Sequence, residues 1–215
     1  MAKLNNKKKI TSIIFDMGGV ILDINSKPTF NVPVALSKMF KIPIDQAQQI
    51  WETCDRQKIV TGHETPKHFL NRIAKKLRLK MDTDKLLSQW TKYSQKDKNC
   101  INWQLMDFIA QLRKKYKVYI LSDTINVAQN DKFTQQLRSR FDGYFVSYEQ
   151  GFKKTDSQAF LNVLSKTSSK PEQTIFIDDT EKYVLAAQNL NLNAILYTSL
   201  PKLKKEINLF LCKTL

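Results

Sequence analysis

The segment Ser-Ile-Ile-Phe-Asp-Met-Gly-Gly at residues 12–19 decides the fold class. Its first four residues are mostly apolar and of strand length, and Asp16 follows them directly. Gly18 and Gly19 come next, and glycine lets main-chain N–H groups approach an anion closely. Ligands of open α/β sheets bind at the carboxyl ends of parallel strands. A strand-ending aspartate with a plain glycine turn explains this segment equally well, so the other strand ends decide between the two interpretations.

Strand-like and helix-like segments alternate through the second half of the chain. Strands are predicted at 118–121, 144–146, 174–177 and 194–197. The segments between them have helical spacing of apolar residues, and they lie at 101–115, up to about 140, around 160–164, at 183–190 and at 203–211. This alternation predicts a Rossmann-like α/β core, in which helices cover both faces of a parallel sheet that includes the strand at 12–15.

The strand signal disappears between the first strand and about residue 99. Helices are predicted there at 33–41, 45–56, 66–77 and 83–94. Thr65 followed by Pro66 is a strong helix start, because a capping hydroxyl precedes a proline at the first helical position. The predicted domains are therefore a Rossmann-like core at 1–23 and 100–215 and a helical cap at 24–99, inserted after the first strand.

Length and composition fit one domain that carries an insertion. The 215 residues are 42% apolar and include 12 Phe, 7 Tyr and 3 Trp, which excludes disorder over most of the chain. No apolar run approaches the roughly 20 residues of a membrane span. The three cysteines are widely spaced, which fits reduced thiols. Because the basic start meets Asp16 before an apolar segment develops, no secretory signal is expected and a cytoplasmic location is predicted.

The chain is strongly basic, with 35 Lys and Arg against 20 Asp and Glu, a formal charge of +15. Such a charge attracts nucleic acids, acidic lipids and phosphorylated metabolites alike. The lysines are spread along the whole chain, and no zinc-finger, RNP-like or basic-zipper pattern accompanies them. We therefore expect a solvated Lys-rich surface and no specific nucleic-acid partner. A nucleic-acid binder remains an interpretation that rests on charge alone.

Chemically useful side chains follow the other predicted strands. Ser122 and Asp123 follow the strand at 118–121, Lys154 lies shortly after the strand at 144–146, and Asp178 with Asp179 follows the strand at 174–177. A carboxylate pair suits a hard cation such as Mg²⁺. Each pair alone also fits a helix cap or a surface cluster. Together they offer a nucleophile, a hydroxyl, a cation and metal carboxylates in one order along the chain.

This order resembles the haloacid dehalogenase-like hydrolase superfamily, and most closely its capped phosphatase branch. The matching stretches are residues 15–23, 122–124, 151–154 and 177–179, and the helical insert lies in the place of the family's cap. Bacterial sugar-phosphatases and the phosphatase domain of epoxide hydrolases are similar. The resemblance implies a Mg²⁺-dependent phosphomonoesterase whose substrate is a small phosphorylated metabolite such as a sugar phosphate. Dehalogenase activity would leave the carboxylate pair without a purpose.

The resemblance also implies roles for single residues. Asp16 would be the nucleophile that forms a phosphoaspartyl intermediate. Ser122 and Lys154 would hold the phosphoryl oxygens, and Lys154 would also neutralise charge in the transition state. Asp123 and Gly19 complete the phosphate-binding group that this resemblance implies.

The implied magnesium ligands come from the first and last of these stretches. They are Asp16, the main-chain carbonyl of Gly18 and Asp179, with Asp178 as a further or outer ligand. The cap would close over the site and select the leaving group. The quaternary structure expected is a monomer or a homodimer.

Three positions depart from the family pattern. Gly18 replaces the second aspartate, which ordinarily protonates the leaving alcohol, and general acid–base catalysis contributes about 10²- to 10⁴-fold. Asp123 replaces a common Asn and adds negative charge, and Thr155 replaces a common Pro. The change to Thr155 is minor, but Gly18 and Asp123 support the alternative of a catalytically weakened member that binds a phosphorylated ligand or an acidic partner. If another acid exists, Asp55 and Glu64 of the cap are the first candidates.

Overall fold

The computed structural model describes residues 9–22, 31–95, 100–127 and 132–211. Its centre is a five-stranded sheet in the order β3-β2-β1-β4-β5, and every neighbouring pair is parallel. The strands are β1 (Ser12–Phe15), β2 (Lys117–Ser122), β3 (Gly143–Val146), β4 (Thr174–Asp178) and β5 (Asn193–Leu196). The predicted parallel α/β core is thus confirmed, and each predicted strand lies within one residue of its observed bounds.

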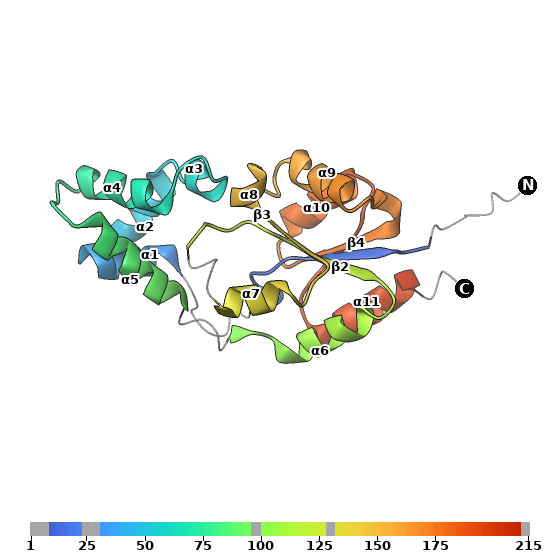
Figure 1. Cartoon of the computed structure of the whole chain (residues 1–215). Coiled ribbons are helices and arrows are strands. Elements are labelled where there is room, and N and C mark those ends of the chain that lie inside the picture. Colours follow the sequence, from blue (N-terminus) through green and yellow to red (C-terminus); the bar gives the residue numbers. More distant parts are fainter. Residues whose placement is uncertain (1–8, 23–30, 96–99, 128–131, 212–215) are drawn as a thin grey trace, which may run out of the picture.

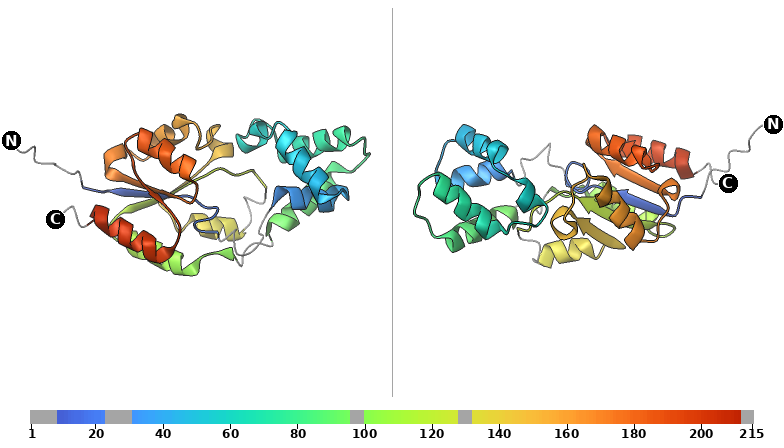
Figure 2. Two further views of the ribbon diagram at one scale, coloured as in Figure 1. Left: turned by 180° about the vertical axis from the view of Figure 1, so that it is seen from behind. Right: turned by 90° about the horizontal axis from the view of Figure 1, so that it is seen from above.

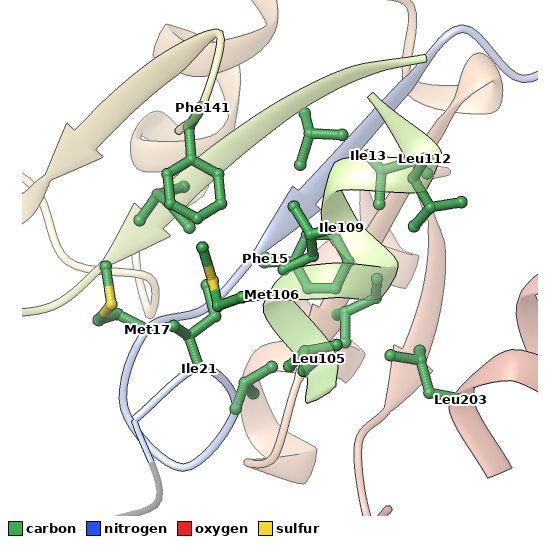
Figure 3. Packing of buried hydrophobic residues seen from close by; sticks show 14 of the residues in the cluster. Ile13, Phe15, Met17, Ile21, Leu105, Met106, Ile109, Leu112, Phe141 and Leu203 are labelled. Atoms are coloured by element: carbon green, nitrogen blue, oxygen red, sulfur yellow. The ribbon is translucent and has the colours of Figure 1, made fainter. Parts of the chain in front are cut away.

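Side chains of β1 alternate between two apolar layers, as successive residues of a strand do. Ile13 and Phe15 pack on one face with α6 (Trp103–Leu112) and α11 (Leu200–Leu211). Figure 3 shows this layer, in which Leu105, Met106 and Ile109 project from α6 toward the strand. All four residues of β1 are buried, so both faces of this strand are covered.

The opposite face of the sheet is covered by a second pair of helices. Ile14 and Phe176 pack there against α9 (Ser157–Lys166) and α10 (Glu181–Asn189). Figure 1 shows α9 and α10 above the sheet and α6 and α11 below it. The remaining elements of the described core are α7 (Lys132–Arg138), the single turn α8 (Ser147–Gln150) and the 3₁₀ turn η2 (Pro171–Gln173).

Residues 31–95 form only helices: α1 (Val32–Phe40), α2 (Ile44–Thr53), α3 (Gln57–Val60), α4 (Pro66–Lys76) and α5 (Thr83–Gln95). They share an apolar cluster of their own, centred on Phe69, Leu70 and Trp90. The predicted start of α4 is confirmed, because the Thr65 hydroxyl accepts a hydrogen bond from the His68 N–H at 3.2 Å. Figure 2 shows this helical unit at one end of the core, on the side to which β1 points.

The helical unit leaves and rejoins the core at neighbouring points. Leu22 and Ile101 form an antiparallel bridge, and the Asn102 N–H donates to the Ile21 carbonyl at 2.9 Å. This pairing is what an insertion after β1 requires. The predicted boundaries between the two domains fall at 23/24 and 99/100. Residues 23, 24 and 99 lie outside the described residues.

The helical unit also contacts the core away from these connections. Ile125 and Val127, which follow β2, belong to the apolar cluster of the helical unit. Gly62, which follows α3, approaches the Tyr148 carbonyl of α8 so closely that a Cβ there would lie 2.1 Å from the oxygen. Among the described residues, no helix combines the length and the apolar character of a membrane span.

Candidate active site

Asp16, Ser122 and Asp178 lie at the carboxyl ends of β1, β2 and β4, which are adjacent strands. All three are buried. Lys154 comes from the loop between α8 and α9, and its side chain is only 3% exposed. Four sequence segments that are far apart thus meet at one edge of the sheet, as the strand pattern predicts.

Lys154 joins the two buried carboxylates of this group. Its Nζ lies 2.8 Å from Asp16 Oδ1 and 2.6 Å from Asp178 Oδ2. The other Asp178 oxygen accepts a hydrogen bond from the Thr180 N–H at 2.8 Å. A buried lysine is costly unless it is paired, and here two anions hold it in its charged form.

Asp179 completes a group of three carboxylates suited to a metal ion. One oxygen each from Asp16, Asp178 and Asp179 can be chosen so that all lie within 4.8 Å of one another. Carboxylate oxygens are the ligands that Mg²⁺ prefers. Three carboxylates against the single ammonium of Lys154 leave an excess of two negative charges, which a divalent cation would balance.

The protonation tendencies agree with this charge count. Burial, together with the charge of Asp178, raises the pKa of Asp16 to about 7 even though Lys154 opposes the shift. Burial and then Asp178 also raise the pKa of Asp179. Burial lowers the pKa of Lys154, but Asp16 and Asp178 outweigh it and the net shift is upward. The site is therefore short of positive charge, which a proton or a cation can supply.

The absence of a side chain at Gly19 leaves space for the Asp179 carboxylate. Gly19 has a φ of +77°, which an L-residue with a side chain rarely adopts, and a Cβ there would lie 1.9 Å from Asp179 Oδ2. Its N–H donates to the Leu22 carbonyl at 2.8 Å, so this amide is engaged within the loop. Gly18 is not among the described glycines with positive φ.

Asp123 contributes to the site through Lys154. Its Oδ1 accepts a hydrogen bond from the Lys154 main-chain N–H at 3.0 Å, and its Oδ2 lies 3.4 Å from the Tyr183 hydroxyl, which donates to it. Burial raises the pKa of Asp123, while Lys154 opposes the shift. The negative charge that the sequence places here thus faces Lys154 and Tyr183.

Two residues of this region escape prediction from the sequence. Tyr183 of α10 lies with its ring centroid 4.5 Å from Lys154 Nζ. Ser147 is 1% exposed, and its hydroxyl both donates to the Thr124 carbonyl and accepts from the Thr124 N–H, each at 3.0 Å. Ser147 therefore fixes the loop that follows Ser122.

Comparison with known proteins identifies this arrangement. A model of the haloacid dehalogenase-like hydrolase family matches residues 10–191. The chain belongs to this family.

Relatives of this hydrolase share its length and its fold. A D-ribitol-5-phosphate phosphatase from Bacteroides thetaiotaomicron is 24% identical, over 79% of this chain and 83% of its own. A structure from Porphyromonas gingivalis, described as a predicted HAD-like family hydrolase, has a TM-score of 0.75 at 20% identity and covers 93% and 98% of the two chains. A HAD family enzyme from B. thetaiotaomicron, complexed with magnesium and inorganic phosphate, has a TM-score of 0.69 at 21% identity over 90% and 98%. The family predicted from the sequence and its fold are confirmed.

The helical unit of this hydrolase contains the two acids considered as substitutes for the missing aspartate. Both oxygens of Glu64 accept hydrogen bonds from the Arg72 guanidinium, at 2.9 and 2.6 Å. Asp55 is more than half exposed and pairs with Lys58 at 3.3 Å. Both Glu64 oxygens are thus engaged in a bidentate ion pair with Arg72, so neither is free to contact a leaving group unless this pair opens.

Proposed function

We propose that this hydrolase is a Mg²⁺-dependent phosphatase of small phosphorylated metabolites, with a sugar or polyol phosphate as its substrate class. The observation that carries the proposal is the buried group of Asp16, Lys154 and Asp178, at adjacent strand ends. The similarity to a D-ribitol-5-phosphate phosphatase supports the substrate class. The related fold that binds magnesium and inorganic phosphate supports the metal.

The residues present fit a magnesium ion. Asp16, Asp179 and the main-chain carbonyl of Gly18 would hold it, with Asp178 as a further or outer ligand. When bound, Mg²⁺ offsets the charge of the carboxylates and of the phosphoryl oxygens. The pKa of Asp16 is raised to about 7 by burial, and a cation beside it would favour the carboxylate that acts as a nucleophile.

The protein residues would carry the reaction in two steps. The Asp16 carboxylate attacks phosphorus, an Asp16 O–P bond forms, and the P–O bond to the alcohol breaks. Ser122 and Lys154 hold the phosphoryl oxygens, and Lys154 stabilises the charge that grows on them. Water then attacks the phosphoaspartyl group, which releases inorganic phosphate and returns Asp16 as a carboxylate. Residues 24–99 would serve as the cap that selects the leaving group.

Gly18 favours a second candidate function. It carries no carboxylate, so the proton for the leaving alcohol must come from water or from the substrate. The protein would then be a weakened member of the family that binds a phosphorylated ligand or an acidic partner with little turnover. The two functions differ in a measurable way, because only the first gives catalytic release of phosphate.

The decisive experiment is a panel of phosphate esters that includes D-ribitol 5-phosphate and several sugar phosphates. Release of inorganic phosphate is measured with Mg²⁺ and with a chelator, and Asp16→Asn, which is nearly isosteric, serves as the blank. We expect Mg²⁺-dependent release that the Asn variant abolishes. Undiminished hydrolysis by the variant would refute the covalent mechanism. Binding of esters without any release would establish the second candidate.

A further inference from the structure

Tyr183 and Asp123 surround Lys154 from two sides. Asp123 holds the main chain of Lys154 through the 3.0 Å bond from its N–H. The Tyr183 ring lies against the other end of the same residue, 4.5 Å from Nζ. The Tyr183 hydroxyl connects the two, since it donates to Asp123 at 3.4 Å. A closed set of contacts therefore spans Lys154 from its main chain to its ammonium group.

This arrangement matters because a lysine side chain is conformationally flexible. Its four-carbon stem has many rotamers, and fixing them in one conformation costs rotamer entropy. The two carboxylates attract Nζ, but when a phosphoryl group arrives the ammonium must serve Asp16 and the new anion together. An aromatic face beside the ammonium stabilises the cation without competing for its three N–H donors.

Tyr183 is well placed to keep this geometry constant. It lies in the first turns of α10, the helix that follows Asp178 and Asp179, and it packs against the apolar layer between α9 and α10. Burial and the nearby Asp123 raise its pKa to about 12, so its hydroxyl stays a donor at neutral pH. The first turn of α10 thus connects Asp178 and Asp179, which precede it, to Tyr183, which contacts Lys154.

We propose that Asp123 and Tyr183 are positioning residues of the phosphatase, which hold Lys154 in the orientation that contacts the transferring phosphoryl group. This inference rests on the proposed function and extends it. It also changes the interpretation of Asp123. Its extra carboxylate supports Lys154, and it is then no argument for a catalytically weakened protein.

Each positioning residue has a disruptive and a conservative variant. Tyr183→Leu removes the ring and the hydroxyl, and we expect kcat to fall about 10- to 100-fold while KM changes less than about threefold, because a misplaced lysine fails mainly in the transition state. Tyr183→Phe keeps the ring and should lose less activity, about 3- to 10-fold relative to wild type. Asp123→Ala should resemble Tyr183→Leu. Asp123→Asn keeps an oxygen acceptor and should restore most of kcat.

The control is Tyr116→Phe, which removes a phenolic hydroxyl group just before the amino end of β2, at the edge of the sheet opposite the site. It should leave kcat and KM unchanged. Thermal unfolding of every variant separates a loss of folded protein from a loss of rate. If Tyr183→Leu does not fold, the inference is decided by Tyr183→Phe and Asp123→Asn with their milder expected losses.

A second measurement distinguishes failure of this inference from failure of the proposed function. Calorimetric titration with inorganic phosphate in Mg²⁺ should show weaker binding in Lys154→Ala, and Tyr183→Phe should weaken binding in wild type but add nothing in the Lys154→Ala background. This result would hold even if no ester were turned over. Equal effects of Tyr183→Phe in both backgrounds, unchanged kcat in all four variants, or phosphate binding that does not depend on Lys154 would overturn the inference.

Discussion

Gly19→Ala tests how the loop after β1 positions Asp179, one of the proposed magnesium ligands. The substitution has two separate effects in this structure. The residue has φ +77°, and the left-handed conformation costs an L-residue about 1–2 kcal/mol. The new Cβ would also lie 2.5 Å from the carboxylate carbon of Asp179, whereas two carbons pack at about 3.5–4.0 Å. The Asp179 carboxylate must therefore move by about 1 Å or more.

The expected magnitudes follow from these two effects. Overpacking typically costs about 1–3 kcal/mol, and Asp179 is half-buried, so it can yield and the lower half of that range applies. We expect the free energy of unfolding to fall by about 2–4 kcal/mol, which lowers Tm by about 4–16 °C for a chain of this size. Displacing a metal carboxylate should weaken Mg²⁺ binding about 10- to 100-fold.

Gly151→Ala is the matched control. Gly151 has φ +81°, close to that of Gly19, but a Cβ there would meet nothing within 4 Å. It should lose only the backbone contribution of about 1–2 kcal/mol and keep its Mg²⁺ affinity. Urea unfolding in chelator gives the stabilities, and calorimetric titration gives the affinities. Equal stabilities and equal Mg²⁺ affinities in the two variants would refute the close approach of Gly19 to Asp179.

Three further predictions concern the metal, the missing acid and the helical unit. Asp179→Ala should raise the Mg²⁺ concentration for half-maximal phosphate release at least about tenfold, and excess Ca²⁺ should inhibit wild type because it distorts octahedral geometry; full activity in chelator would contradict both. Gly18→Asp should accelerate esters with poor leaving groups most, measured as a shallower slope of log kcat/KM against leaving-group pKa. Equal slopes for both proteins, with wild type already fast on alkyl phosphates, would indicate that another acid is present. Gly62→Ala should lower Tm by about 4–20 °C, because the residue has φ +75° and a Cβ would clash with the Tyr148 main-chain carbonyl; an unchanged Tm would mean that this contact is not formed.

The fold could be predicted from the sequence to a large extent, because its signals are local. Each strand is a short apolar run followed by polar residues, and the helices α4 and α6 repeat apolar residues at helical spacing. The single-turn helices α3 and α8 were missed, since four residues are too few for a period to appear. The short strand β3 could be predicted because the aromatic and β-branched residues 144–146 lie between Gly143 and Ser147.

The candidate site was predicted as a set of residues, and its internal geometry was not. Asp16, Ser122 and Asp178 could be assigned because parallel strands end at one edge. The direction of the Asp123 side chain depends on a main-chain N–H that lies 31 residues away, which no local pattern reveals. Tyr183 occupies an apolar position of an amphipathic helix, so its sequence context indicates packing alone. Gly19 stays a predicted member of the phosphate-binding group, and the sequence did not reveal that its N–H donates to the Leu22 carbonyl at 2.8 Å.

The two main departures from the family pattern therefore differ in kind. Gly18 removes a carboxylate from the loop beside Asp16, and Asp123 adds one at the end of β2, but the second does not replace the first. Both Asp123 oxygens accept hydrogen bonds, one from the Lys154 N–H and one from Tyr183. If Asp123 carried a proton for the leaving alcohol, its neutral carboxyl would be a weaker acceptor for both contacts, and the proposed support of Lys154 would be loosened. We therefore expect the absent acid to make the rate depend on the leaving group, while the proposed support of Lys154 by Asp123 would preserve phosphoryl transfer. A double variant, Gly18→Asp with Asp123→Asn, should consequently remain active on poor leaving groups, because it restores the acid and keeps the acceptor that positions Lys154.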